Sequence, residues 1–418
     1  MPKISRIIAR EILDSRGNPT IETSVLLTSG AYGTASVPSG STAGSGEDVE
    51  LRDQDPTRYN GMGVLSAVKN VNEVIAPKLV GIDARDQELV DSTMLTLDGT
   101  KNESRLGANS ILSVSIASLK AAANYSRQPL FMYIAQKYGT PTPLNIPHPT
   151  FNIINGGRHG AGNLDFQEFH IVPSTRFSYN IALRMGVEIY QLLKDELIHR
   201  NAIHSVGDEG GFAPNLFTNS DALEITTMAI KNSSHKLNQD VYLALDTAAD
   251  NFFKDGKYAI KDMPRPVDRD GMIDYYKTLL KDYPLFSLED PLKQDDYDGW
   301  AKLRREIPPN TLVVGDDLLT SNLAKLQTAI EKESINAILV KPNQAGSVTA
   351  TVAVIKHARD NKIYTILSHR SGETNDTFIA DLAVGLGVNF TKFGAPIRGE
   401  RVAKYNRLLE IESYLGAT

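Results

Sequence analysis

The stretch from residue 284 to residue 341 reads PLFSLEDPLKQDDYDGWAKLRREIPPNTLVVGDDLLTSNLAKLQTAIEKESINAILVK, and its pattern repeats. Its three short apolar runs lead to the charged residues Glu289, Asp316 and Lys341. A segment with helical periodicity follows each of the first two runs. Short strands that alternate with helices are typical of βα units.

The same spacing continues on both sides of this stretch. An upstream run, VYLALD, ends at Asp246, and two downstream runs end at Ser368 and Lys392. From Glu289 onward, successive run ends are 27, 25, 27 and 24 positions apart, which is about one strand, one helix and two loops. This spacing predicts an α/β barrel with its active site at the C-terminal ends of the strands. The alternative explanation for the polar run ends is that polar residues are common in the turns that follow strands.

The N-terminal third has a different pattern. Residues 3–38 contain three extended runs separated by turn residues, which predicts a three-stranded antiparallel meander. Helical periodicity follows in three segments, residues 64–80, 86–97 and 108–123. Four prolines then crowd residues 141–149, which predicts a domain boundary because proline interrupts helices and sheet ladders. We therefore expect an α+β capping domain over residues 1–138 and a barrel over residues 139–418.

Composition excludes several classes of protein. Hydrophobic residues make up 41% of the 418 residues and charged residues 22%, which is ample for a folded core. The net charge of −6 argues against bulk nucleic-acid binding. The absence of cysteine excludes disulfides and thiolate chemistry. The charged N-terminus and the lack of a long apolar run predict a cytoplasmic protein without a transmembrane segment.

The acidic strand ends predict a metal site. Asp246, Glu289 and Asp316 would repel one another at one barrel mouth unless a cation neutralises them, and carboxylate oxygen is the ligand that Mg²⁺ prefers. Lys341 is the candidate base. We expect a nearby Mg²⁺ and Lys392 to lower the pKa of Lys341, because like charges disfavour the charged form. A structural ion-pair network is the equally weighted alternative for this lysine.

Other candidate residues lie in loops. Glu168 in QEFHIVP and Glu209 in SVGDEGGFAP add two acidic groups. His159 lies in the glycine-rich segment NGGRHGAGN, where a structural histidine is the alternative. The segment SHRSGET places Arg370 and Ser371 at a strand end, a combination suited to phosphate or carboxylate. A helix cap beside a surface arginine is the alternative there.

Taken together, these motifs resemble one family, the enolases. The matching segments run in order from Leu13 to Leu409 and include LDSRGNPT, LDGTKNESRLGANSIL, NGGRHGAGN, QEFHIVP, VGDEGGFAPN, SLEDP, VVGDDLLTSN, LVKPNQAGSVT and ILSHRSGET. The resemblance implies a small α+β cap on an eight-stranded α/β barrel whose second strand is antiparallel. It also implies the reversible dehydration of 2-phosphoglycerate to phosphoenolpyruvate, with two Mg²⁺ ions per site.

The resemblance further implies roles for single residues. Asp246, Glu289 and Asp316 would bind the first Mg²⁺, and Thr42 in the loop at residues 40–44 would offer its hydroxyl to the second. Lys341 would remove the proton from the carbon that bears the phosphate. Glu209 would be the acid that assists departure of the hydroxyl, with Glu168 and His159 close to that end. The residues expected to contact the substrate are Gln167, His369, Arg370, Ser371 and Lys392, with Arg370 and Ser371 on the phosphate.

The sequence leaves two rival functions open. One is a related lyase or epimerase that abstracts a proton beside a different carboxylate; the SHRSGET segment argues against it. The other is a non-catalytic binding protein at the cell surface, which would be a secondary location. The family resemblance suggests a homodimer or a ring of dimers.

Overall fold

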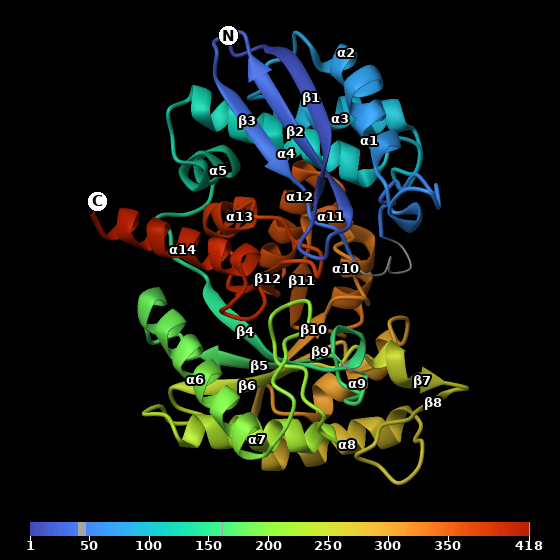
Figure 1. The fold of residues 1–418 in the computed structure, drawn as a ribbon, viewed down its shortest axis with the longest axis vertical. Helices are drawn as coiled ribbons and strands as arrows, with labels where there is room; N and C mark the ends of the chain where they lie inside the picture. Colours follow the sequence, from blue (N-terminus) through green and yellow to red (C-terminus); the bar gives the residue numbers. More distant parts are fainter. Residues whose placement is uncertain (41–46, 161, 418) are drawn as a thin grey trace.

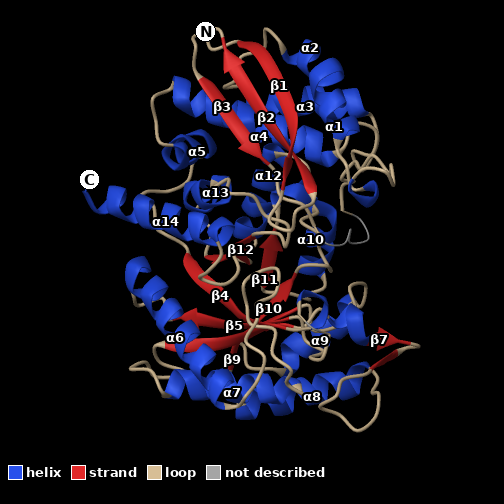
Figure 2. Ribbon diagram, in the orientation of Figure 1, coloured by secondary structure: helices blue, strands red, loops and turns tan. Residues whose placement is uncertain are grey.

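The computed structural model describes residues 1–40, 47–160 and 162–417, which form a smaller N-terminal domain packed on a barrel (Figure 1). The capping domain lies at the top of this view and the barrel strands lie below it, surrounded by helices (Figure 2). None of the described helices is both long enough and apolar enough to cross a membrane.

The capping domain begins with the predicted antiparallel meander, which is confirmed. Its strands are β1 (Ile4–Leu13), β2 (Pro19–Leu27) and β3 (Tyr32–Ser36), paired in the order β1-β2-β3. β2 alternates buried and less buried side chains, as a strand with one covered face should. Helix α4 (Ala108–Tyr125) packs on β2 and β3 so closely that a Cβ on Gly33 would lie 2.3 Å from the Ala117 carbonyl oxygen.

The three predicted helical segments of the cap are also confirmed. The first is a continuous run of α1 (Leu65–Lys69), a π-helical turn η2 (Asn70–Ile75) and α2 (Ala76–Leu79). The second is α3 (Gln87–Asp98) and the third is α4. A short 3-10 turn η1 (Tyr59–Gly61) precedes them, and α5 (Leu130–Tyr138) ends the domain. The division at residue 138 stays a prediction.

Eight strands close into a barrel, as predicted. In spatial order they are β4 (His148–Asn155), β5 (Glu168–Pro173), β6 (Val241–Asp246), β9 (Leu285–Glu289), β10 (Leu312–Gly315), β11 (Ala337–Val340), β12 (Tyr364–Ser368) and β13 (Phe390–Lys392). β5 pairs antiparallel with both β4 and β6, whereas the other pairs are parallel. The antiparallel second strand is therefore confirmed.

Helices and short elements connect these strands. The longer helices are α6 (Tyr179–His199), α7 (Asn219–Lys231), α8 (Arg269–Asp282), α9 (Tyr297–Glu306), α10 (Leu323–Glu331), α12 (Val348–Asp360), α13 (Phe378–Leu386) and α14 (Gly399–Ala417). The short elements are η3 (Gly157–His159), η4 (Ala249–Phe252), α11 (Pro342–Ala345) and the hairpin of β7 (Phe253–Lys254) with β8 (Lys257–Tyr258). Side chains that accept backbone N–H bonds cap several helix starts, among them Asp268, Asp296, Asn322 and Ser347.

The cap is joined to the loop that follows β12. Ser39 and Gly372 form a two-way backbone bridge, with N···O distances of 2.8 and 3.1 Å. Lys120 on α4 places its Nζ 2.6 Å from Asp376 Oδ1, and both residues are largely shielded from solvent. These contacts hold the chain around residue 40 of the cap against the C-terminal ends of the barrel strands.

Candidate active site

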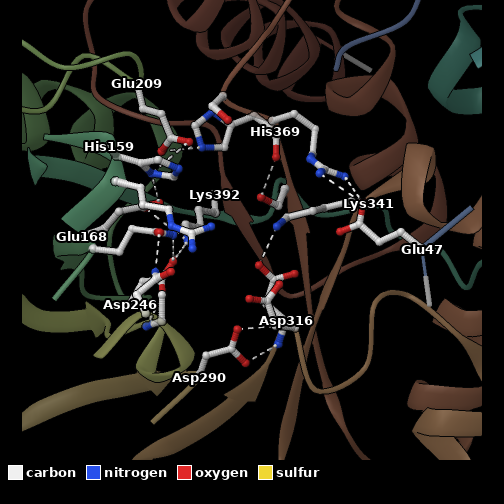
Figure 3. Close-up of a pocket in the computed structure, with 18 residues that line it drawn as sticks. Glu47, His159, Glu168, Glu209, Asp246, Asp290, Asp316, Lys341, His369 and Lys392 are labelled. Carbon is white, nitrogen blue, oxygen red and sulfur yellow. Dashed lines mark hydrogen bonds and ion pairs between the residues drawn. The ribbon is translucent and has the colours of Figure 1, made fainter. Parts of the chain in front are cut away.

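Charged side chains gather at the rim where the parallel strands end (Figure 3). Asp246, Glu289 and Lys392 are the last residues of β6, β9 and β13 and are buried. Lys392 Nζ lies 2.9 Å from Asp246 Oδ2 and 2.9 Å from Glu289 Oε1. Burial would lower the pKa of Lys392, but these carboxylates outweigh burial and raise it well above its usual value. Lys392 is therefore an ammonium ion that neutralises the strand ends.

Glu168 reaches the same rim because its strand runs in the opposite direction. It is the first residue of β5, and its Cα lies opposite that of Asp246. Its Oε2 lies 3.2 Å from Lys392 Nζ and 2.8 Å from His170 Nε2. Burial would raise the pKa of Glu168, but Lys392 and the adjacent histidines hold it well below its usual range. We call Lys392, Asp246, Glu289 and Glu168 the Lys392 cluster.

Glu209 lies between two histidines in the loop between α6 and α7. Its Oε1 is 3.5 Å from His159 Nδ1, and its Oε2 is 3.3 Å from His369 Nε2. Burial and Glu168 would raise the pKa of Glu209, but the two histidines hold it at about 2. Burial would lower the pKa of His159, but Glu209 and Glu168 raise it to about 9. The proton of the Glu209–His159 pair therefore resides on His159. The family resemblance, by contrast, implies that Glu209 is the acid.

Lys341 follows β11 and is paired with a carboxylate of the neighbouring strand end. Its Nζ lies 2.5 Å from Asp316 Oδ2. Burial lowers the pKa of Lys341, and the positive charges of Arg370 and Lys392 lower it further. Asp316 has the opposite effect and outweighs them, so the pKa of Lys341 is raised. The expected lowering includes the effect of Mg²⁺, so it stays a prediction; the sequence spacing does not reveal the contact with Asp316.

The predicted phosphate-binding residues lie on a further side of the pocket. Arg370 donates hydrogen bonds to Asn343 Oδ1 at 2.9 Å and Glu47 Oε2 at 3.3 Å, so cap and barrel meet at this guanidinium. Ser371 lines the same pocket. Gln167 donates to Asp246 Oδ2 at 3.5 Å and lines it too. Thr42, the residue expected at the second Mg²⁺, lies outside the described residues.

The donor set fits a hard divalent cation. Within the part of the chain that the structure describes, Asp290, Asp316 and Asp317 offer carboxylate oxygens within 4.8 Å of one another, and Asp316 Oδ1 is buried without a hydrogen-bond partner. Burial and neighbouring acids raise the pKa of Asp317 to about 7, which a bound cation would reverse. A second described group, with the same spacing limit, is His159, Glu168 and Glu209.

The predicted trio Asp246, Glu289 and Asp316 is not one of these two compact groups. In the described structure, Lys392 contacts the first two residues and Lys341 contacts the third. Burial and Asp246 nevertheless raise the pKa of Glu289 well above its usual value, so Lys392 neutralises the cluster incompletely. A cation at these oxygens would compete with both lysines for the carboxylates.

Several pocket residues were not identified from the sequence as site residues. Among them are Glu47, Asn251, Asp290 and Asp317. Asp290 and Asp317 directly follow two predicted ligands, and that adjacency was an available signal. Asp290 adopts a φ of 43° and accepts hydrogen bonds from the backbone N–H groups of Asp316 and Asp317, at 3.0 and 2.8 Å. It thereby fixes the turn that presents Asp316.

Almost all of the residues that line the pocket are polar or charged. It brings together His159, Gln167, Glu168, Glu209, Asp246, Asp316, Lys341, His369, Arg370, Ser371 and Lys392. Glu289 accepts a hydrogen bond from Lys392, and Lys392 lines the pocket. Carboxylates outnumber the lysines and arginines in this lining, so an anionic ligand would bind there together with a cation.

Comparison with known families agrees with this arrangement. A model of the enolase N-terminal domain matches residues 4–134, and a model of the enolase C-terminal TIM barrel domain matches residues 143–418. The two matches occur in the order of the two domains and cover nearly the whole chain. Domains of this kind indicate a lyase-type enzyme. The chain belongs to the enolase family.

Proposed function

We propose that the chain catalyses the reversible dehydration of 2-phosphoglycerate to phosphoenolpyruvate. One observation carries this proposal: Lys341 faces the pocket from one side, and the Glu209–His159 pair faces it from another (Figure 3). Removal of water from a hydroxy acid needs a base at one carbon and an acid at the next. Family membership supports the same chemistry.

Lys341 is the proposed base. Its Nζ accepts the proton from the carbon that bears the phosphate, and it does so only as the neutral amine. It must therefore first lose the proton that the contact with Asp316 stabilises. Lys392 remains an ammonium ion and stabilises the negative charge that develops on the substrate carboxylate.

The Glu209–His159 pair is the proposed acid for the departing hydroxyl. The proton on His159 passes to the leaving oxygen, which departs as water. Glu168 stabilises the charged His159 at 3.2 Å, and His369 lies on the other side of Glu209. Arg370 and Ser371 are the proposed contacts of the phosphate, since a guanidinium binds phosphate through two parallel hydrogen bonds.

Mg²⁺ is the proposed cofactor, with two ions per site. Asp246, Glu289 and Asp316 would hold the first, and the Thr42 hydroxyl would contribute to the second. When bound, the metal would neutralise charge on the substrate carboxylate. We further propose a cytoplasmic homodimer or ring of dimers.

The substrate assignment is tested by comparing 2-phosphoglycerate with glycerate, which lacks the phosphate. Wild-type protein should turn over only the phosphorylated acid. Arg370→Gln should raise KM by about 10- to 100-fold, because a hydrogen bond to a charged group contributes binding free energy of that size. The exposed Arg305→Gln is the matched control and should behave as wild type. Equal turnover of glycerate would instead favour a superfamily enzyme with another substrate.

A further inference from the structure

Arg401 is a fully buried arginine on α14 that the proposed chemistry does not use. Its guanidinium donates to the carbonyl oxygens of Arg370 at 2.6 Å, Ser371 at 2.7 Å and Asp208 at 3.2 Å. It also lies 2.6 Å from His369 Nδ1. One side chain thus ties the loop that carries Glu209 to the turn that carries the proposed phosphate contacts.

The contact with His369 determines where the imidazole proton lies. A guanidinium has only donors and stays protonated in proteins, so His369 Nδ1 must be the acceptor of this hydrogen bond. Burial lowers the pKa of His369, and the positive charge of Arg401 acts in the same direction against the opposing effect of Glu209. A neutral imidazole whose Nδ1 accepts a hydrogen bond carries its proton on Nε2.

His369 lines the pocket, and its buried Nε2 faces Glu209 (Figure 3). It lies 3.3 Å from Glu209 Oε2, yet it makes no well-aligned hydrogen bond to any residue that the structure describes. Gly394 leaves room for this ring, because a Cβ at that position would lie only 2.9 Å from His369 Cε1. The Nε2 proton is thus held close to Glu209 and available to a ligand.

We infer that Arg401 is a positioning residue that fixes His369 in the Nε2–H tautomer and so directs a hydrogen-bond donor at Glu209 and the departing hydroxyl. The kinetic part of this inference rests on the proposed function, but the tautomer does not. A purely structural role for Arg401, that of satisfying three buried carbonyl groups, would leave the tautomer independent of the arginine.

The tautomer is measurable by ¹⁵N NMR on protein labelled with [¹⁵N]histidine, because protonated and unprotonated ring nitrogens differ widely in chemical shift. The chain has 8 histidines, and His369→Asn identifies the relevant signals. Wild-type protein should show a protonated Nε2 and an unprotonated Nδ1 at His369. A protonated Nδ1 in the wild-type protein would overturn the inference without any Arg401 variant.

Two substitutions and one control complete the test. Arg401→Met should release the constraint and give a mixture of tautomers or a charged ring, and Arg401→Lys should restore the wild-type signals because it keeps a charged donor. Lys404→Met is the control for loss of a buried cation on α14, since Lys404 is equally buried and contacts Thr374 O and Glu373 without touching His369. It should leave the tautomer unchanged.

Kinetics separate this inference from the proposed function. Arg401→Met should lower kcat by about 10²-fold, the size of an oriented acid–base contribution, and Arg401→Lys should recover part of the loss. A folded Arg401→Met protein with the wild-type tautomer would refute the inference alone. A wild-type protein that shows the expected tautomer but no turnover of 2-phosphoglycerate would refute the proposed function alone.

Discussion

Lys341 Nζ lies 2.5 Å from Asp316 Oδ2, so the proposed base is paired with a carboxylate that is also a proposed metal ligand. Asp316 stabilises the charged form of Lys341 and raises the pKa of the lysine. A cation that binds Asp316 in place of Lys341 would remove this stabilisation of the charged lysine. Metal binding and activation of the base are therefore linked through one carboxylate.

Mg²⁺ should stabilise the folded protein through Asp316. A ligand that binds only the folded state at 100 times its Kd adds about 2.7 kcal/mol to the free energy of unfolding. Asp316→Asn should remove most of this gain, because an amide is a weaker ligand than a carboxylate. Thermal unfolding with and without Mg²⁺ measures the effect. Asp274→Asn, at an exposed site on α8, should retain the full gain; an undiminished gain in Asp316→Asn would contradict the assignment.

Lys392→Met should destabilise the protein strongly in the absence of metal. The substitution leaves Asp246, Glu289 and Glu168 without their common cation, and removal of one partner of a buried ion pair costs about 3–5 kcal/mol. Mg²⁺ should recover part of this loss, since it neutralises the same carboxylates. Chemical unfolding with and without Mg²⁺ tests both statements, with the exposed Lys332→Met as control. Equal losses in both conditions would contradict a metal site in the Lys392 cluster.

The contact between Lys120 and Asp376 should make the domain junction sensitive to acid. Burial would raise the pKa of Asp376, but Lys120 and the backbone N–H groups of Ser36 and Phe378 outweigh it and lower the pKa. The resulting stability is present above the unfolded pKa of about 3.9 and is lost as pH falls through the lower folded pKa.

Asp376→Asn should therefore cost about 3 kcal/mol near neutral pH, and the difference from wild type should shrink below about pH 4. Unfolding measured across this pH range tests the sign. A difference that stayed constant down to the lowest pH would mean that Asp376 does not titrate with folding.

Glu103→Gln should stabilise the protein at alkaline pH. Burial and the charges of Asp48 and Asp98 raise the pKa of Glu103 to about 9, and its Oε2 lacks a partner among the described residues. The folded protein therefore keeps a proton that the unfolded chain releases above pH ~4.3, so stability falls as pH rises from there to about 9.

Glutamine keeps the neutral shape and removes this titration. The gain over wild type should grow with pH and reach at least about 2 kcal/mol at pH 8. Unfolding at pH 5 and pH 8 tests it, with the exposed Glu333→Gln as control. Equal stabilities of wild type and Glu103→Gln at pH 8 would refute the raised pKa.

The strand ends were the most predictable part of the site. Asp246, Glu289 and Lys392 meet because parallel strands of a closed barrel end at one rim, and the spacing of the runs was enough to predict that. Glu168 is a candidate from the sequence alone, but its place at this rim depends on the antiparallel direction of β5, which only the family resemblance implies.

Contacts that depend on loops and on distant helices could not be predicted from the sequence. No spacing rule reveals that Asp316 pairs with Lys341 and raises the pKa of the lysine. Arg401 lies 32 positions from His369, on the last helix, and no spacing rule places its guanidinium on that ring. Glu47 belongs to the cap, so its contact with Arg370 depends on how the two domains pack.

The most direct test of the central claim is the ultraviolet absorbance of phosphoenolpyruvate formed from 2-phosphoglycerate by the full chain with Mg²⁺. The wild-type protein should produce it, excess chelator should abolish it, and Lys341→Ala should lower the rate by about 10²–10⁴-fold while the protein remains folded. A folded wild-type protein that forms no phosphoenolpyruvate, or a Lys341→Ala variant with undiminished turnover, would contradict it.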